Sequence, residues 1–250
     1  MIIEPIILEV EKMNVYGIKK LPFNKNNSLV VMFHGFTGNH IETNRLFADL
    51  EKKILEEGIG TLRFDYRYHG DSDGYFEDFS LSVALIDAEH IMEHVLSDNR
   101  INHGKIGVIG LSLGGAVTIY ISSRYDISTL VLWSAVSKNW FRKKLEIVNS
   151  VKDEYIHLYG AYRIKREKML DIATFNIDEY LPRIRAPTLI IHARDDQAVT
   201  IDDPKYTYSK LTSKKKILWL DEGGHTFSHY DVKKYVIEKT TEWFKKYLEK

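Results

Sequence analysis

The stretch K-I-G-V-I-G-L-S-L-G-G at residues 105–115 decides the expected fold. Its first six residues have the pattern of a buried strand, and A-V-T-I-Y-I at 116–121 has the spacing of a helix. Between them, Gly110, Ser112 and Gly114 form the pattern G-x-S-x-G at a tight strand-to-helix turn. Such a turn strains the serine backbone and leaves no room for side chains at the flanking glycines. It also presents the hydroxyl beside the N–H groups that begin the helix, so Ser112 is the candidate nucleophile.

Short apolar runs alternate with longer helical patterns on both sides of this turn. Strands are expected at 28–33, 60–65, 105–110, 128–133, 187–192 and 215–220, and helices at 42–57, 80–97, 113–124, 201–212 and 230–249. Several of these strands are apolar almost throughout, as strands covered on both faces must be. The alternation therefore predicts an α/β fold with a mostly parallel central sheet and helices on both faces. The first 20 residues are expected to add an antiparallel hairpin that turns near Asn14 or Gly17.

The interval from Ser134 to Pro187 breaks this alternation. It contains no apolar strand of the buried type, only helical patterns such as W-F-R-K-K-L-E-I-V at 140–148 and Y-R-I-K-R-E-K-M-L at 162–170. The interval is too long for a crossover connection between strands. We therefore expect a lid insertion at 134–182 over one end of a core formed by residues 1–133 and 183–250.

A serine hydroxyl needs a base to activate it, and the base needs a group that orients it. In an open parallel sheet these partners are expected after later strands. Asp196 follows the strand at 187–192, and His225 follows the strand at 215–220. The chain order Ser112, Asp196, His225 is the order expected for this topology. Asp195 and Asp221 are rivals for the acidic position. The alternative to a nucleophile is a glycine-rich turn with a solvent-exposed serine.

Acyl transfer also needs two fixed N–H donors for the oxygen that becomes negative. The N–H of Leu113, directly after the serine, is one candidate, and the N–H of Phe36 in H-G-F-T-G at 34–38 is the other. His34 is expected to brace this loop rather than to act as the base. Aromatic residues are candidates for the wall of a substrate pocket, with packing as their alternative role: Trp133, Trp140, Phe141 and Tyr159.

Five motifs resemble those of the α/β-hydrolase superfamily in order and spacing. They are H-G-F-T-G at 34–38, Y-R-Y-H-G-D-S-D-G at 66–74, G-L-S-L-G-G at 110–115, H-A-R-D-D at 192–196 and E-G-G-H-T-F at 222–227. The first two motifs and the length of the insertion look most similar to bacterial feruloyl/cinnamoyl-type carboxylesterases. In that subgroup a small lid subdomain binds the aromatic acyl part of hydroxycinnamate esters.

The resemblance implies a role for each candidate. Ser112 would be the nucleophile, with His225 as general base and Asp196 as its partner. The N–H groups of Phe36 and Leu113 would form the oxyanion hole. These roles require no metal or organic cofactor, and the resemblance allows a homodimer.

We therefore expect a serine carboxylesterase that hydrolyses small acyl or hydroxycinnamoyl esters through an acyl-enzyme intermediate. A thioesterase, a monoacylglycerol or lysophospholipid hydrolase, or a peptidase would use the same machinery and stays an alternative, as does a non-catalytic binding protein. H-I-M-E-H at 90–94 has the order of a zinc motif. A zinc site needs a third protein ligand, and a solvated helix face explains these residues as well.

The composition limits the remaining classes of function. The 250 residues contain no cysteine, which excludes disulfides, thiolate metal sites and a cysteine nucleophile. The 35 lysines and arginines balance 35 aspartates and glutamates, so the net charge attracts neither nucleic acid nor anionic lipid. The N-terminus lacks the pattern of a signal peptide, and no run of about 18 apolar residues is present. We expect a cytoplasmic protein whose partner is a small-molecule ester.

Overall fold

A computed structural model describes residues 1–23 and 26–249. Its centre is an eight-stranded sheet in the order β1-β2-β4-β3-β5-β6-β9-β10. The strands are β1 (Ile2–Val10), β2 (Met13–Leu21), β3 (Asn27–Phe33), β4 (Gly60–Phe64), β5 (Ile101–Leu111), β6 (Thr129–Trp133), β9 (Thr188–Ala193) and β10 (Lys215–Leu220). Pairing is antiparallel at β1–β2 and β2–β4 and parallel from β4 to β10. The expected mostly parallel sheet is confirmed, and its strand β5 begins at Ile101 rather than at 105.

The N-terminal hairpin turns at Glu11 and Lys12, so the expected turn near Asn14 or Gly17 is wrong. Glu11 and Lys12 have φ values of 50° and 67°. Positive φ at both residues of a two-residue loop is typical of a type I′ turn, whose twist matches that of the flanking strands. Gly17 lies inside β2, where a Cβ would come within 2.6 Å of the carbonyl oxygen of Arg63 on β4. This glycine therefore permits close strand pairing and makes no turn.

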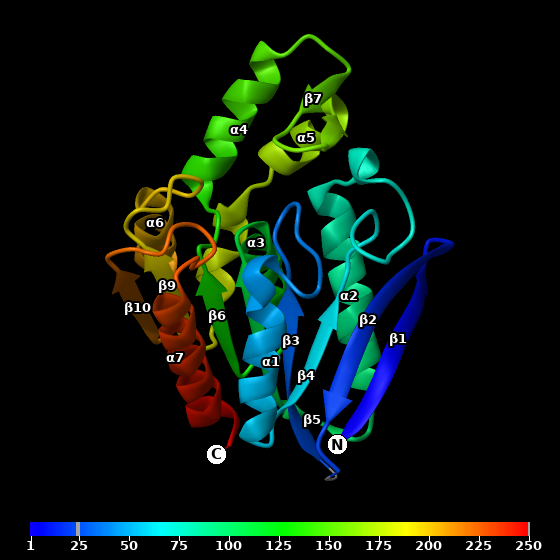
Figure 1. Cartoon of the computed structure of the whole chain (residues 1–250), viewed down its shortest axis with the longest axis vertical. Helices are drawn as coiled ribbons and strands as arrows, with labels where there is room; N and C mark the ends of the chain where they lie inside the picture. Colours follow the sequence, from blue (N-terminus) through cyan, green and yellow to red (C-terminus); the bar gives the residue numbers. More distant parts are fainter. Residues whose placement is uncertain (24–25, 250) are drawn as a thin grey trace.

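Helices cover both faces of the sheet (Figure 1). One face carries α1 (Leu46–Glu56) and α7 (Tyr230–Leu248), and the other carries α2 (Leu81–Ser97) and α3 (Leu113–Arg124), with α6 (Asp202–Lys210) against β9. Short 3₁₀ turns complete the described chain: η1 (Thr43–Arg45), η2 (Phe76–Asp78), η3 (Ile177–Glu179) and η4 (Leu181–Arg183).

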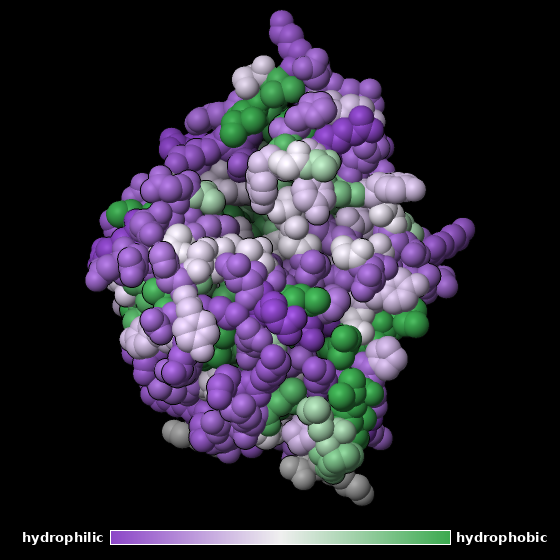
Figure 2. Space-filling model, in the orientation of Figure 1, coloured by the Kyte–Doolittle hydropathy of each residue, from purple (hydrophilic) through white to green (hydrophobic). Residues whose placement is uncertain are grey.

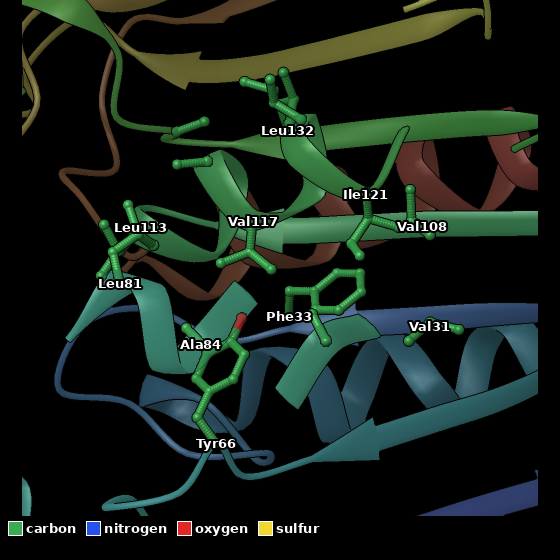
Figure 3. Packing of buried hydrophobic residues seen from close by; sticks show 14 of the residues in the cluster. Val31, Phe33, Tyr66, Leu81, Ala84, Val108, Leu113, Val117, Ile121 and Leu132 are labelled. Carbon is green, nitrogen blue, oxygen red and sulfur yellow. The ribbon is translucent and has the colours of Figure 1, made fainter. Parts of the chain in front are cut away.

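The two hydrophobic cores explain why the central strands are apolar throughout. Along β3, Val31 and Phe33 belong to the core beneath α2 and α3, whereas Val30 and Met32 belong to the core beneath α1 and α7. Successive side chains of a strand point to opposite faces, so a strand covered on both sides needs apolar residues at every position. Figure 3 shows the first of these cores, with side chains of β3 beside those of α3.

Between β6 and β9 the chain forms α4 (Lys138–Ser150), a hairpin of β7 (Tyr155–His157) and β8 (Arg163–Lys165), and α5 (Arg166–Ala173). We call residues 138–173 the insertion segment. Figure 1 shows it beyond the carboxyl ends of the parallel strands. The expectation of helical material alone is wrong here, because strands of three residues are too short to show a two-residue period. That 134–182 forms a lid separate from the core stays a prediction.

The last feature of the fold is the character of its helices. None of those within 1–23 and 26–249 combines the length and the apolar character that crossing a membrane requires.

Candidate active site

Ser112 stands at the turn between β5 and α3. Its backbone has φ 54° and ψ −117°, a strained conformation that residues other than glycine rarely adopt. A Cβ at Gly110 would lie 2.1 Å from the carbonyl oxygen of Gly114, and a Cβ at Gly114 would lie 2.0 Å from that of Phe33. These separations are far inside van der Waals contact, so only glycine fits at both positions. The tight strand-to-helix turn expected from G-x-S-x-G is therefore present.

Asp196 and His225 contact each other in the loops that follow β9 and β10. Nδ1 of His225 donates to Oδ2 of Asp196 over 2.8 Å. The second carboxylate oxygen, Oδ1, accepts from the N–H groups of Ala198 and Val199 at 2.8 and 2.9 Å. Burial raises the pKa of Asp196, but the hydrogen bond from His225 and those from the backbone outweigh it and hold the pKa below its ordinary value. A charged carboxylate in this position can orient an imidazole and stabilise its protonated form.

The two rival acids occupy other places. Asp195 accepts hydrogen bonds from the N–H groups of Gly223 and Gly224 at 3.2 and 2.9 Å, and so fixes the turn that precedes the histidine. Asp221 is fully exposed and lies 3.5 Å from an arginine side chain. Of these three described aspartates, only Asp196 contacts the imidazole.

Hydrogen bonds fix the loop at 34–38, which follows β3. The carbonyl of Gly35 accepts from Nδ1 of His34 at 2.9 Å and from the N–H of Gly38 at 3.1 Å. A trans peptide points its C=O and its N–H in opposite directions, so these bonds also fix the direction of the Phe36 N–H. Among residues 1–23 and 26–249, no acceptor contacts that N–H. Leu113 begins α3, and the first N–H groups of a helix have no intrahelical acceptor. Neither of these two N–H groups therefore has an acceptor within the described ranges.

His34 braces this loop, as expected. It is buried, and its Nε2 accepts the N–H of Tyr66 over 3.1 Å while Nδ1 donates to the carbonyl of Gly35. Burial lowers the pKa of His34 to about 3. Because the ring is neutral and both nitrogens are engaged, it is not placed to take a proton from Ser112.

Ser112 and His225 line one pocket of about 390 Å³. It lies between the insertion segment and the carboxyl ends of the strands, where Figure 2 shows a hollow edged by white and pale green residues. The Ser112 hydroxyl makes no hydrogen bond to any described residue, and catalytic contacts of this kind often tighten only when substrate binds. Trp140 and Tyr159, two of the candidate wall residues, line this pocket. The hydroxyl of Tyr159 lies 3.0 Å from Oγ1 of Thr37 and links the insertion segment to the loop at 34–38.

Trp133 and Phe141 do not line this pocket, so these two wall assignments are wrong. Trp133 is fully buried beneath α7, where its Nε1 donates to Oγ1 of Thr240 over 2.9 Å. It ends β6, and its side chain points to the opposite face of the sheet. Phe141 is 3% exposed and packs against Trp140 and Phe175 in the core. Adjacent residues of a helix point about 100° apart, so Trp140 faces the pocket while Phe141 does not.

Three site residues escaped the sequence analysis. Nε2 of His69 donates to the carbonyl of Phe36 at a distance of 2.5 Å. Oε1 of Glu42 accepts the N–H of Gly35, also at 2.5 Å, so both side chains hold the loop at 34–38. Glu42 and Lys144 line the pocket. His69 lies in the motif at 66–74, which signals this loop only through the resemblance. Glu42 and Lys144 lie in no motif, and only their placement in three dimensions identifies them.

The zinc-like motif on α2 has an ordinary structural explanation. Nδ1 of His90 donates to the carbonyl of Ile86 over 2.9 Å, within the helix. Within the described ranges, the ligand atoms that do come together belong to His40, Asp65 and Asp71. There Nδ1 and the N–H of His40 both donate to Asp65, at 2.9 and 2.5 Å, and the N–H of Asp71 donates to it at 3.0 Å. These bonds give the Asp65 carboxylate a role in holding the loop after β4.

Comparisons with known proteins identify the family and the fold of the chain. A protein-family model described as "Serine aminopeptidase, S33" matches residues 24–156, more than half of the chain. The chain is 23% identical over 249 residues to the protein YqkD of Bacillus subtilis, covering 92% of this chain and 75% of that protein. It is 23% identical over 261 residues to the putative esterase YitV of Bacillus subtilis, covering 97% and 100%.

Among solved structures, the chain is similar to Est1E from Butyrivibrio proteoclasticus with ferulic acid bound. The TM-score is 0.86 at 20% identity, and the match covers 98% of this chain and 100% of that one. At this identity the likeness establishes the fold, which is the α/β-hydrolase fold expected from the motifs. Together with the family match over residues 24–156, this shows that the chain is an α/β hydrolase and belongs to the serine aminopeptidase S33 family.

Proposed function

We propose that this α/β hydrolase cleaves carboxylic esters, with Ser112 as nucleophile. The observation that carries the proposal is the contact of buried Asp196 with His225, a residue that lines the same pocket as the strained serine. Ser112 and His225 line this pocket from two separate loops, and Asp196 contacts the histidine from a third; a surface serine needs none of these arrangements. This supports a serine hydrolase over a binding protein on the same fold.

The reaction follows the order of a serine hydrolase. The oxygen of Ser112 attacks the ester carbonyl while Nε2 of His225 takes the hydroxyl proton. Nδ1 of the same ring keeps its proton because it faces the carboxylate of Asp196. The imidazolium then returns a proton to the leaving alcohol, and a water molecule cleaves the acyl-enzyme by the same steps. No step requires a metal or an organic cofactor.

The negative oxygen of each tetrahedral intermediate is assigned to the N–H groups of Phe36 and Leu113. Their support is the fixed peptide at Gly35 and the free N-terminal N–H of α3. Loss of one such donor costs about 10²–10³ in rate.

Small acyl and aromatic acyl esters, including hydroxycinnamoyl esters, are the proposed substrates. Trp140 and Tyr159 give the pocket aromatic walls, and the similar structure of Est1E holds ferulic acid. The name of the family makes an aminopeptidase the second candidate. A free α-ammonium group would need an available carboxylate, but Glu42 already accepts N–H groups of Gly35 and Thr43 at 2.5 and 3.0 Å. The pocket therefore supports an esterase better than an aminopeptidase.

The test is hydrolysis of p-nitrophenyl esters by the wild-type chain and by Ser112→Ala. We expect kcat to fall by about 10⁴–10⁶ in the variant, whereas Ser123→Ala, on the far half of α3, keeps wild-type activity. A fluorophosphonate probe should label Ser112 and no other serine. Full activity of Ser112→Ala would contradict the assignment.

A panel of hydroxycinnamoyl esters, acyl-CoA, monoacylglycerol, lysophospholipid and aminoacyl peptides then separates the substrate classes. Preferred turnover of a thioester, a lipid ester or a peptide would replace the proposed substrate class and keep the nucleophile. A cytoplasmic location and a homodimer stay predictions, which cell fractionation and sedimentation equilibrium test.

A further inference from the structure

Lys144 brings a positive charge into the candidate active-site pocket. It lies on α4 one turn after Trp140, and both side chains line the pocket that contains Ser112 and His225. Residues four apart on a helix share one face. The Lys144 ammonium lies 5.0 Å from the centre of the Trp140 ring, a cation–π contact that directs it along the aromatic wall.

This ammonium has no anionic partner in the described part of the chain. No carboxylate lies within ion-pair distance of Lys144, and none of its described neighbours accepts a hydrogen bond from it. Other partly covered lysines are paired, as Lys19 is with Asp98 at 2.5 Å and Lys20 with Glu51 at 2.6 Å. Lys144 is partly buried, so its charge is partly removed from water, and this burial lowers its pKa. Such a charge destabilises the fold unless something compensates it.

The other ionisable side chains on the described pocket wall, those of Glu42 and His225, do not neutralise this ammonium. Glu42 is the carboxyl among the lining residues, and its two oxygens accept the N–H groups of Gly35 and Thr43. Burial raises the pKa of Glu42, which favours its neutral form. His225 is held as the candidate base by Asp196. The described pocket wall thus offers one cation without an anionic partner, in the same pocket as the candidate nucleophile.

We infer that Lys144 binds a carboxylate that the substrate carries in addition to its ester group, so that the preferred substrates are monoanionic esters. This rests on the proposed ester hydrolysis. A monoanion fits the site better than a phosphate, because no arginine or second lysine stands among the described lining residues. The bound carboxylate would supply the partner that Lys144 lacks in the free protein.

The test compares matched charged and neutral esters. For the acyl side the pair is p-nitrophenyl hemiadipate and p-nitrophenyl hexanoate, and for the alcohol side it is 4-acetoxybenzoate and its methyl ester. Lys144→Met removes the charge and keeps the length of the side chain, and Lys144→Arg keeps the charge. Lys143→Met removes an exposed charge from the adjacent position of the same helix and serves as the matched control.

We expect Lys144→Met to raise KM for the charged member of at least one pair by about tenfold or more, with little change in kcat. The neutral esters should change less than about twofold, Lys144→Arg should restore part of the loss, and Lys143→Met should match the wild type. Added salt should weaken the wild-type preference and leave Lys144→Met unaffected.

Two results overturn the inference. One is a Lys144→Met variant with the wild-type KM for both charged esters, while the wild-type enzyme hydrolyses the neutral esters through Ser112. The other is an equal loss on charged and neutral esters, which would assign Lys144 a structural role. Failure of the proposed function looks different, because then no ester of either pair is hydrolysed and the fluorophosphonate probe leaves Ser112 unlabelled.

Discussion

Replacing Asp196 by asparagine exchanges one acceptor oxygen for an NH₂ donor, and the structure determines where that donor points. Oδ1 of Asp196 accepts the N–H groups of Ala198 and Val199 at 2.8 and 2.9 Å. Turning the amide so that its NH₂ meets these two donors would break both bonds, at about 1–3 kcal/mol for each unsatisfied group. The amide oxygen therefore stays there, and the NH₂ takes the place of Oδ2, 2.8 Å from Nδ1 of His225.

This orientation disables the candidate base. A donor facing Nδ1 requires that nitrogen to accept, so the ring proton moves to Nε2, which must be free to take the proton of Ser112. Loss of the correct tautomer in this way costs about 10⁴ in kcat, or about 5 kcal/mol of transition-state stabilisation. The folded structure should survive, because the substitution keeps the shape of the side chain and both backbone hydrogen bonds.

The assay is steady-state hydrolysis of a p-nitrophenyl ester, with circular dichroism to verify folding. Asp195→Asn is the matched control, since Asp195 touches the turn at Gly223 and Gly224 but not the imidazole. It loses one hydrogen bond to that turn, and we expect a decrease in kcat/KM of about tenfold or less. The reasoning is refuted if folded Asp196→Asn keeps more than a tenth of the wild-type kcat, or if Asp195→Asn proves the more damaging change.

Three further changes test other parts of the molecule. Trp133→Phe removes the hydrogen bond to Thr240 on the face away from the pocket. The free energy of unfolding in urea should fall by about 2 kcal/mol while KM stays unchanged. An altered KM would indicate that Trp133 contacts the substrate after all. Tyr159→Phe removes the contact with Thr37. Because Tyr159 is 80% exposed, we expect KM to rise only about two- to fivefold at constant kcat. A decrease in kcat would indicate instead that this contact positions the loop at 34–38. Burial lowers the pKa of Lys144, so this side chain should lose its charge at a lower pH than an exposed lysine does. The ratio of kcat/KM for charged over neutral esters should therefore fall at that lower pH. A ratio that stays constant up to the pH at which an exposed lysine deprotonates would contradict this.

The candidate catalytic residues could be predicted because a tight turn or the end of a strand fixes the position of each one. These residues are Ser112, Asp196 and His225. Gly110 and Gly114 can be nothing but glycine at the turn that holds Ser112. The loops after β9 and β10 begin at neighbouring ends of parallel strands, so residues just beyond those ends meet at one edge of the sheet. The order of the residues along the chain and their positions after strands were therefore enough to predict that Asp196 and His225 lie together, and the structure shows this contact.

Features that no typical residue pattern signals were missed for identifiable reasons. The first hairpin turns at Glu11 and Lys12, which are not typical turn residues, so Asn14 and Gly17 drew the prediction away. Glu42 reaches the loop at 34–38 only because the chain after β3 folds back on itself. No periodic pattern in the sequence reports such a contact.

Helix α4 shows that part of the pocket wall was nevertheless readable. Phe141, Leu145 and Val148 are spaced by four and three residues and form the apolar stripe that packs into the core. Trp140 and Lys144 each precede a member of that stripe and lie beside it on the pocket side. A helical wheel of 138–150 thus separates Phe141 from Trp140, which packs into the same buried cluster and also lines the pocket. Grouping the aromatic residues by type does not make this distinction.

This division by faces has an energetic consequence. Truncating Phe141 to alanine should cost about 3–5 kcal/mol of stability, because the side chain is 3% exposed and its removal leaves a cavity. Lys144→Met gives up the cation–π contact with Trp140 but keeps the length of the side chain and relieves a partly desolvated charge, so it should leave the free energy of unfolding unchanged or raise it. A rise in stability together with a selective loss on charged esters is the combination expected of a residue retained for binding rather than for folding.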